Sequence, residues 1–113
     1  MSWKRATTTE MPTTYRFTPD AQSDLIDIRR FTVQQWGAAQ SQIYLSDLRS
    51  TIRLLAETPS LGKPRPEVGE HVLSFPHVSH VIYYVIHEQQ VVVFGVLHKR
   101  MVPLNHLTER TVD

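Results

Sequence analysis

The chain has 113 residues, which is enough for one domain with a single hydrophobic core. It is 41% hydrophobic and 20% charged, carries a formal charge of +1 and lacks cysteine. These values argue against a surface that coats nucleic acid, and they exclude disulfides, thiol nucleophiles and thiolate metal sites. No apolar run approaches the roughly 18 residues of a membrane helix, so we expect a soluble, cytoplasmic protein.

Residues 1–14 are rich in threonine and show neither the apolar stretch of a signal peptide nor a helical or strand period. We therefore predict that they form a disordered N-terminal extension. The pattern of a folded domain begins only at Tyr15, and both Met1 and Met11 are candidate translation starts.

A short strand is predicted at residues 15–17, followed by an amphipathic helix that ends near Trp36. Thr18 has the character of an N-cap, with proline in the first turn. A helical spacing relates its apolar residues, which are Ala21, Leu25, Ile28 and Trp36.

Gly37 separates this helix from a second one, which is predicted from Ala38 to about Thr58, where Pro59 forbids continuation. The apolar stripe of the second helix consists of Tyr44, Leu48, Ile52 and Leu55. The two helices should form a hairpin whose stripes lie on one face of a sheet.

The prolines and glycines of residues 59–69 predict a loop, and the residues that follow predict three strands. The first runs from 71 to 75, with a turn at Pro76-His77. The other two form a hairpin around the polar triplet 88–90, and the apolar run from Val91 to Leu97 is expected at the centre of the sheet.

In the segment 98–107, Met101, Leu104 and Leu107 are expected to pack back on the fold, and residues 108–113 are expected to form a flexible tail. The sequence thus predicts one α+β domain at residues 15–107. Its order is β-α-α-β-β-β, with the helical hairpin packed on one face of a small antiparallel-rich sheet.

Six histidines raise the question of a metal site. His77 and His80 are three residues apart on or beside a strand, so they should point to opposite faces, and no carboxylate pair completes a shell. We predict no metal and no cofactor. Asp24 and Asp27 are interpreted as structural residues on a solvated helix face.

One constellation could carry chemistry, and it lies where the chain leaves the predicted central strand. It consists of His98, Lys99 and Arg100, with His80, Tyr83 and Tyr84 on the paired strand and Lys63 and Arg65 in the preceding loop. Such a group could cleave RNA without a metal, or bind an acidic partner. The third interpretation, a charged strand end with the two tyrosines alternating between core and surface, is the one that composition alone favours.

Several motifs together give the chain a family resemblance. They are a helix start with Pro19, Ala21, Asp24, Leu25 and Ile28, the pair Trp36-Gly37, Pro59 with Gly62, and VLHKRM from Val96 to Met101. In this order and spacing they resemble the ParE toxins of the RelE/ParE superfamily, over Tyr15 to Leu107.

The resemblance implies a toxin of a type II toxin–antitoxin system that inhibits DNA gyrase, is not an enzyme and is neutralised by a ParD-like antitoxin. The residues that we expect to contact the target are His98, Lys99, Arg100, Met101 and His106. The antitoxin is expected beside the helical hairpin, at Trp36, Tyr44 and Leu48, and along an exposed sheet edge. Sequence-specific binding of nucleic acid is not expected.

The alternative implied by the same superfamily is a RelE-like, ribosome-dependent mRNA endoribonuclease, with His98, Arg100, His80 and Tyr84 as its catalytic residues. The nuclease branch usually has arginine where this chain has His80, and the strand predicted at 71–75 contains no cation. A transition state with two negative charges would then lack its clamp, which favours the non-nuclease branch. A member that binds its antitoxin without being toxic is a third hypothesis.

Overall fold

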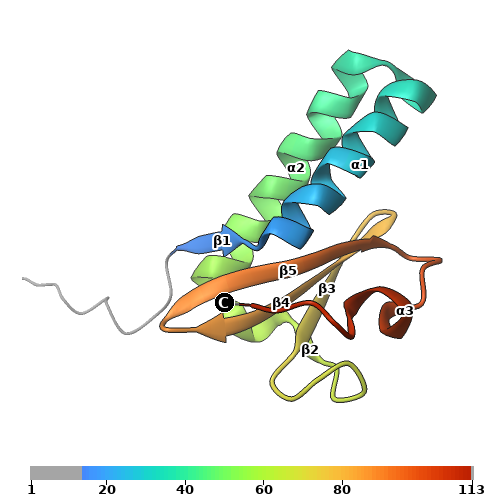
Figure 1. The fold of residues 1–113 in the computed structure, drawn as a ribbon. Coiled ribbons are helices and arrows are strands. Elements are labelled where there is room, and N and C mark those ends of the chain that lie inside the picture. The colour runs from blue at the N-terminus through green and yellow to red at the C-terminus, as the bar shows by residue number, and fades with distance from the viewer. Residues whose placement is uncertain (1–13, 113) are drawn as a thin grey trace, which may run out of the picture.

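The computed structural model describes residues 14–112 and gives the elements drawn in Figure 1. They are β1 (Tyr15–Phe17), α1 (Pro19–Trp36), α2 (Ala38–Glu57), a 3-10 turn (Pro59–Leu61), β2 (Lys63–Pro64), β3 (Leu73–His77), β4 (His80–His87), β5 (Gln90–His98) and α3 (Pro103–Leu107). The α+β class and the helical hairpin are confirmed. Most of the predicted N-terminal extension, residues 1–13, lies outside the described residues.

Local capping chemistry sets the boundaries of the two long helices. The Thr18 hydroxyl accepts a hydrogen bond from the Ala21 amide at 3.2 Å, and Pro19 occupies the first turn. Gly37, with φ of 90°, joins α1 to α2, and its amide bonds to the carbonyl of Val33. The predicted helix boundaries are therefore confirmed within one residue.

The predicted apolar stripes are buried with one exception, Trp36, whose side chain is 49% exposed. Thr32 takes its place in the interface between the helices. Its hydroxyl lies 2.6 Å from that of Ser41 on α2, so a polar pair connects the two helices close to Gly37.

The five strands form one mixed sheet in the order β1-β5-β4-β3-β2. β1 pairs with β5 in parallel, with Tyr15 opposite Val91, and the other neighbours are antiparallel. β5 is an interior strand, as predicted, but β4 holds the middle position. The reason is β2, a short edge strand in the segment for which a loop was predicted, whose residues pair with Leu73 and Ser74.

The strand predicted at 71–75 is shifted to Leu73–His77, and the turn predicted at Pro76-His77 falls at Val78 and Ser79. The consequence is that His77 and His80 lie opposite each other across the β3–β4 pair. The prediction that they point to opposite faces was wrong, because the turn lies between them.

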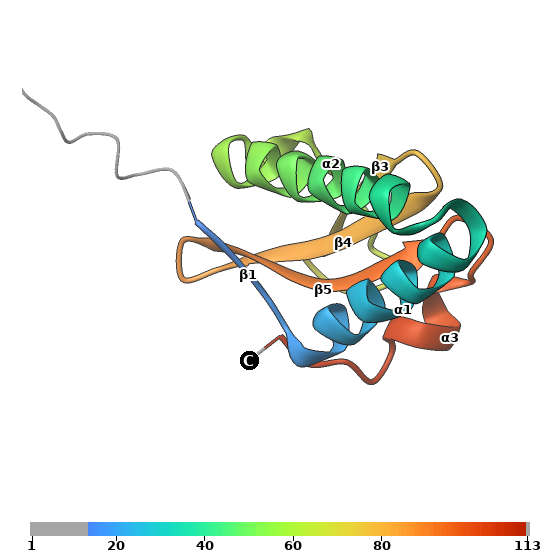
Figure 2. The ribbon, with the colours of Figure 1, turned by 90° about the horizontal axis from the view of Figure 1, so that it is seen from above.

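The sheet is covered on both faces (Figures 1 and 2). On the helix side, α1 and α2 pack against Ile82, Tyr84 and Val93, among others. On the other side, Val72, Tyr83, Phe94, Leu97 and Leu107 form a second core. The alternation of Tyr83 and Tyr84 between core and surface was therefore wrong: both are buried, in different cores.

The C-terminal segment closes a gap beside β5. Phe94 is the extra residue of a β-bulge opposite Tyr83 and Tyr84, and β1 pairs no further than Val93. The amide of Val96 donates to Asp24 at 2.9 Å, and Arg110 donates to the Phe94 carbonyl at 3.1 Å. Two side chains thus satisfy backbone groups that no strand reaches.

Arg110 and Asp24 also bond to each other, at 2.6 and 3.0 Å, and both side chains are mostly buried. Arg16 donates to the carbonyl of Val112 at 2.6 Å. Residues 108–112 are thus held against the sheet, in contrast to the flexible tail that was predicted for them. Asp24 is structural, as predicted, but it does not lie on a solvated face.

Candidate functional site

The basic residues that follow β5 are positioned by backbone hydrogen bonds. The Lys99 amide donates to the Ser79 carbonyl at 2.9 Å, and the Met101 amide donates to the His98 carbonyl at 2.9 Å. The Arg100 amide donates to His98 Nδ1 at 3.1 Å. These bonds fix the turn beside the β3–β4 turn, while the side chains of Lys99 and Arg100 stay exposed.

Large apolar side chains are exposed on the same two turns and at the start of α3. Val78 is 67% exposed, and Met101, Val102 and Leu104 are between 44% and 54% exposed. Met101 and Leu104 were predicted to pack back on the fold, which only Leu107 does. We call the group of Val78, Lys99, Arg100, Met101, Val102 and Leu104 the strand-exit patch.

Beneath this patch lies a cluster of aromatic and imidazole rings between α2 and the sheet. Tyr44 Oη lies 2.6 Å from His80 Nδ1, and Thr51 Oγ1 lies 2.9 Å from His77 Nδ1. The His80 and His98 rings face each other edge to face across the β4–β5 pair, with centroids 5.5 Å apart. The cluster adjoins the patch at two places along the chain, where His77 precedes Val78 and where His98 precedes Lys99.

Burial sets the ionisation of the cluster. Removal from water, together with the nearby His98 and His77, lowers the pKa of His80 to about 4. Burial likewise lowers the pKa of His77 and raises that of Tyr44. Tyr44, His77 and His80 are therefore uncharged at neutral pH. Their burial costs no ionic desolvation, and the contacts of Tyr44 and Thr51 with the two histidines join α2 to the sheet.

The structure does not bring the four predicted ribonuclease residues together on an accessible surface. His80 is 6% exposed and Tyr84 is fully buried, with its hydroxyl donating to the Pro59 carbonyl at 2.6 Å. His98 and Arg100 remain accessible to a large substrate. Two of the four predicted catalytic residues, His80 and Tyr84, thus belong to the buried interior.

Lys63 and Arg65 lie at the other end of β3 from His77. Arg65 donates to Ser74 at 2.9 Å and to Glu67 at 3.0 Å, so its charge is partly neutralised there. The predicted grouping of these two cations with Lys99 and Arg100 was wrong, since β2 pairs with the start of β3 and the patch adjoins its end.

Of the residues expected to contact an antitoxin, Tyr44 and Leu48 are buried, at 7% and 0% exposure, and stabilise the helix packing. Trp36 is accessible and lies edge-on to Tyr44, with ring centroids 5.7 Å apart. His106, expected at the target contact, is exposed on α3. Two hollows along the seam between α1 and α2 were not predicted, because they depend on how the two helices pack against each other.

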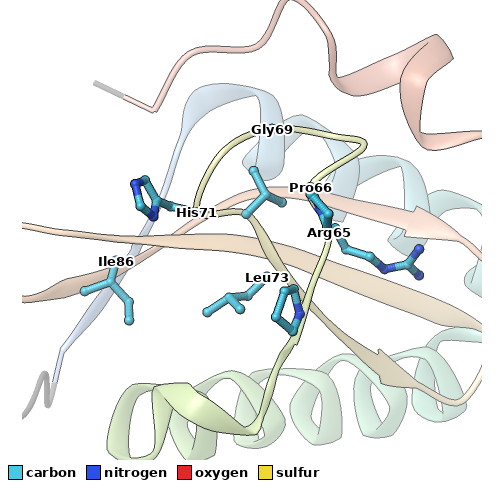
Figure 3. A pocket seen from close by; sticks show the side chains of 8 residues that line it. Arg65, Pro66, Gly69, His71, Leu73 and Ile86 are labelled. Carbon is cyan, nitrogen blue, oxygen red and sulfur yellow. The ribbon is translucent and has the colours of Figure 1, made fainter.

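A further hollow of about 470 Å³ lies at the edge of the sheet, between the loop that carries Pro66 and Gly69 and the strands that carry Leu73 and Ile86 (Figure 3). Its lining is mainly apolar. Among the strands described, β2 pairs with only the first two residues of β3, so no described strand pairs with the outer edge of Phe75, Pro76 and His77.

Within residues 14–112, no three side chains of the types His, Asp and Glu are grouped so that they could hold a metal ion. In the same range no helix combines the length and the hydropathy that crossing a bilayer requires.

Comparisons with known proteins agree with this architecture. The family described as the ParE toxin of type II toxin-antitoxin system, parDE, matches residues 15–103. Toxin ParE1 of Caulobacter vibrioides is 33% identical over 93 residues, covering 82% of this chain and 96% of that protein. Toxin ParE1 of Mycobacterium tuberculosis is 33% identical over 80% of this chain and 94% of its own length, and toxin ParE of Escherichia coli is 29% identical over 87% and 96%.

Two solved structures share the fold. The chromosomal ParDE toxin–antitoxin system from P. aeruginosa aligns with a TM-score of 0.67 at 15% identity, covering 77% of this chain and 96% of that one. The toxin–antitoxin complex RelBE2 from Mycobacterium tuberculosis aligns with a TM-score of 0.57 at 25% identity, covering 79% and 100%.

The helical hairpin on a small mixed sheet, with these relatives, defines a toxin of a toxin–antitoxin system. The chain belongs to the ParE toxin family of the type II parDE systems.

Proposed function

We propose that this toxin inhibits DNA gyrase by binding it, without catalysing a reaction, and that a ParD-like antitoxin neutralises it. The observation that carries the proposal is the composition of the strand-exit patch. It joins two exposed cations to four exposed apolar side chains, whereas two of the candidate acid–base groups, His80 and Tyr84, are buried.

This mixture is typical of a protein-binding surface. Large apolar side chains supply the buried area of an interface, and arginine supplies directed hydrogen bonds at its rim. Lys99 and Arg100 would meet acidic groups of the target, with His106 close by on α3. The cytoplasm is where such a toxin would meet gyrase.

The decisive experiment is a supercoiling assay with purified gyrase. Wild-type toxin is expected to block supercoiling and to leave cleaved DNA. The charge-reversed variant Lys99→Glu/Arg100→Glu should need at least ~10-fold more protein, because two rim charges then repel the target.

Lys63→Glu/Arg30→Glu is the matched control, since it makes the same change in charge at exposed positions away from the patch. It should inhibit like the wild type. If gyrase runs normally at excess toxin, the proposal fails. If mRNA is cut in a translation extract that contains ribosomes, the RelE-like nuclease is the right function instead.

Support for the antitoxin comes from the solved relatives, which are described as a toxin–antitoxin system and a toxin–antitoxin complex. The chain also offers surface for a segment that folds on binding, since Trp36 is exposed and no described strand pairs with the outer edge of β3 beyond Ser74. The product of the adjacent reading frame should copurify with the toxin and restore growth. Toxin expression that leaves growth unaffected without that product would contradict toxicity.

A further inference from the structure

The turn between β3 and β4 has a backbone conformation that its residues do not favour. His77 and His80 pair across the two strands, so Val78 and Ser79 make up a two-residue turn. Val78 has φ of 52°, and Ser79 is not among the described residues with positive φ. A positive φ at the first turn residue alone is the pattern of a type II′ turn, where glycine is usual. Valine is strained there, because its β-carbon crowds the neighbouring backbone.

Contacts from two sides hold this turn in place. On the side of α2, the Tyr44 hydroxyl donates to the His77 carbonyl at 3.3 Å, and Thr51 Oγ1 lies 2.9 Å from His77 Nδ1. On the side of β5, the Lys99 amide donates to the Ser79 carbonyl at 2.9 Å. Backbone strain persists where the surrounding structure fixes the conformation, and such positions are concentrated at binding and catalytic sites.

The strained side chain adds little to the core. Val78 is 67% exposed, more than any other large apolar side chain among the described residues. An exposed valine at a position that suits glycine stabilises neither the turn nor the interior, so the stability of the fold does not account for it. The turn adjoins the end of β5 (Figure 1), which places Val78 in the strand-exit patch beside the exposed cations Lys99 and Arg100.

We propose that Val78 is the apolar anchor of the strand-exit patch, and that it inserts into a small apolar pocket of gyrase bordered by carboxylates. The isopropyl group has few rotamers and the turn is already fixed, so little conformational entropy is lost on binding. Lys99 and Arg100, which form no ion pair within residues 14–112, meet the carboxylates. The inference rests on the proposed function, since it names the residue and the kind of pocket that join the toxin to its proposed target.

The test is the affinity of the intact chain for purified gyrase, with inhibition of supercoiling as a second measurement. Val78→Thr keeps the shape and the β-branch of the side chain, and it is expected to raise Kd by at least ~5-fold, because a hydroxyl group then enters an apolar pocket. Val78→Gly removes the anchor and should raise Kd by at least ~10-fold. It should nevertheless unfold at or above the wild-type midpoint, because relief of strain offsets the larger entropy of the unfolded chain.

Gln89→Gly is the matched control. Gln89 is exposed and also has positive φ, at 62°, but it lies in the β4–β5 turn, at the other end of β4 from the patch. Glycine there should likewise not lower the unfolding midpoint. Both the Kd for gyrase and the inhibition of supercoiling should stay within ~2-fold of the wild type.

The possible results separate this inference from the proposed function. If the wild type inhibits gyrase and both Val78 variants bind it as tightly as Gln89→Gly does, the inference is overturned and the proposed function stands. A lower unfolding midpoint of Val78→Gly would also overturn it, because the turn would then hold Val78 without strain. Weaker binding of the Val78 variants to a duplex DNA probe, with unchanged affinity for gyrase, would assign the side chain to DNA instead. If the wild type neither binds nor inhibits gyrase, the inference and the proposed target both fail.

Discussion

His80 shows how one buried side chain makes the fold sensitive to pH. Its pKa is lowered to about 4 in the folded chain, first by burial and then by two neighbouring histidines, against ~6.5 in the unfolded chain. The unfolded state therefore binds more protons between these values. The stability due to neutral His80 is complete above ~pH 6.5 and is lost as the pH falls toward 4.

From this shift we predict that the free energy of unfolding falls by about 2 kcal/mol between pH 7.5 and pH 5. Urea unfolding at several pH values measures it. In His80→Gln, which carries no titrating ring, the pH dependence should become shallower by a similar amount. An identical dependence in the wild type and the variant would contradict the assignment to His80.

Gly62 is a residue whose missing side chain matters. A β-carbon there would overlap the hydroxyl of Tyr84 and lie 2.8 Å from the adjacent ring carbon. We predict that Gly62→Ala breaks the bond from Tyr84 to the Pro59 carbonyl and costs about 2–3 kcal/mol of stability. Thermal unfolding is the measurement.

Gly69→Ala is the comparison for this prediction, because its β-carbon would meet only a Val72 methyl group, at 3.1 Å. Its effect should be smaller. The double variant Gly62→Ala/Tyr84→Phe should recover part of the loss, since the overlapping hydroxyl is gone. Gly62→Ala with wild-type stability would show that this contact relaxes at no cost.

Among the elements, the boundaries of the helices could be predicted and those of β3 could not. The reason is that the residues which end a helix act over only a few positions of the sequence. Thr18, Gly37 and Pro59 act on their immediate neighbours, so the helix boundaries followed from the sequence. The β3–β4 turn contains Val78 at φ of 52°, which is unusual for a β-branched residue and carries no glycine or asparagine signal. That turn was consequently placed two residues early.

In the candidate site, too, local features could be predicted and contacts between distant residues could not. The exposure of Lys99 and Arg100 followed from charge at the end of an apolar strand. The burial of Tyr44 by the β3–β4 turn, and the pairing of Arg110 with Asp24, join residues far apart in the chain. No local pattern encodes either contact.

The contact between α1, the β5 bulge and the C-terminal segment leads to a prediction at the level of elements. Asp24→Ala or Arg110→Ala leaves one mostly buried charge without its partner and frees a backbone group of the bulge. Each change should cost about 2–4 kcal/mol. Denaturant unfolding of both variants measures the loss.

The double variant Asp24→Ala/Arg110→Ala should be more stable than the sum of the single losses implies, with a coupling of about 1–3 kcal/mol. Arg30→Ala is the control, since its ion pair with Asp27 is exposed and 3.8 Å long. Strict additivity of the two core variants would mean that the ion pair does not hold the segment in place.

For the molecule as a whole, the second core makes the C-terminal segment part of the fold. Removal of residues 102–113 would uncover Tyr83, Phe94 and Leu97 and take away Leu107. We predict that the shortened chain binds a hydrophobic dye and loses cooperative unfolding. Met101→Ser/Leu104→Ser, which changes two exposed side chains, should leave the midpoint of unfolding nearly unchanged.

The parallel pairing of β1 with β5 has a consequence for synthesis in the cell. The first strand of the sheet has no partner until Val91 to Val93 have left the ribosome, and the closing contacts span almost the whole domain. Chains that end before Val91 therefore lack β5 and cannot complete the main core, which leaves apolar side chains of the helices exposed. The sheet closes only in a chain that has been synthesised beyond Val93.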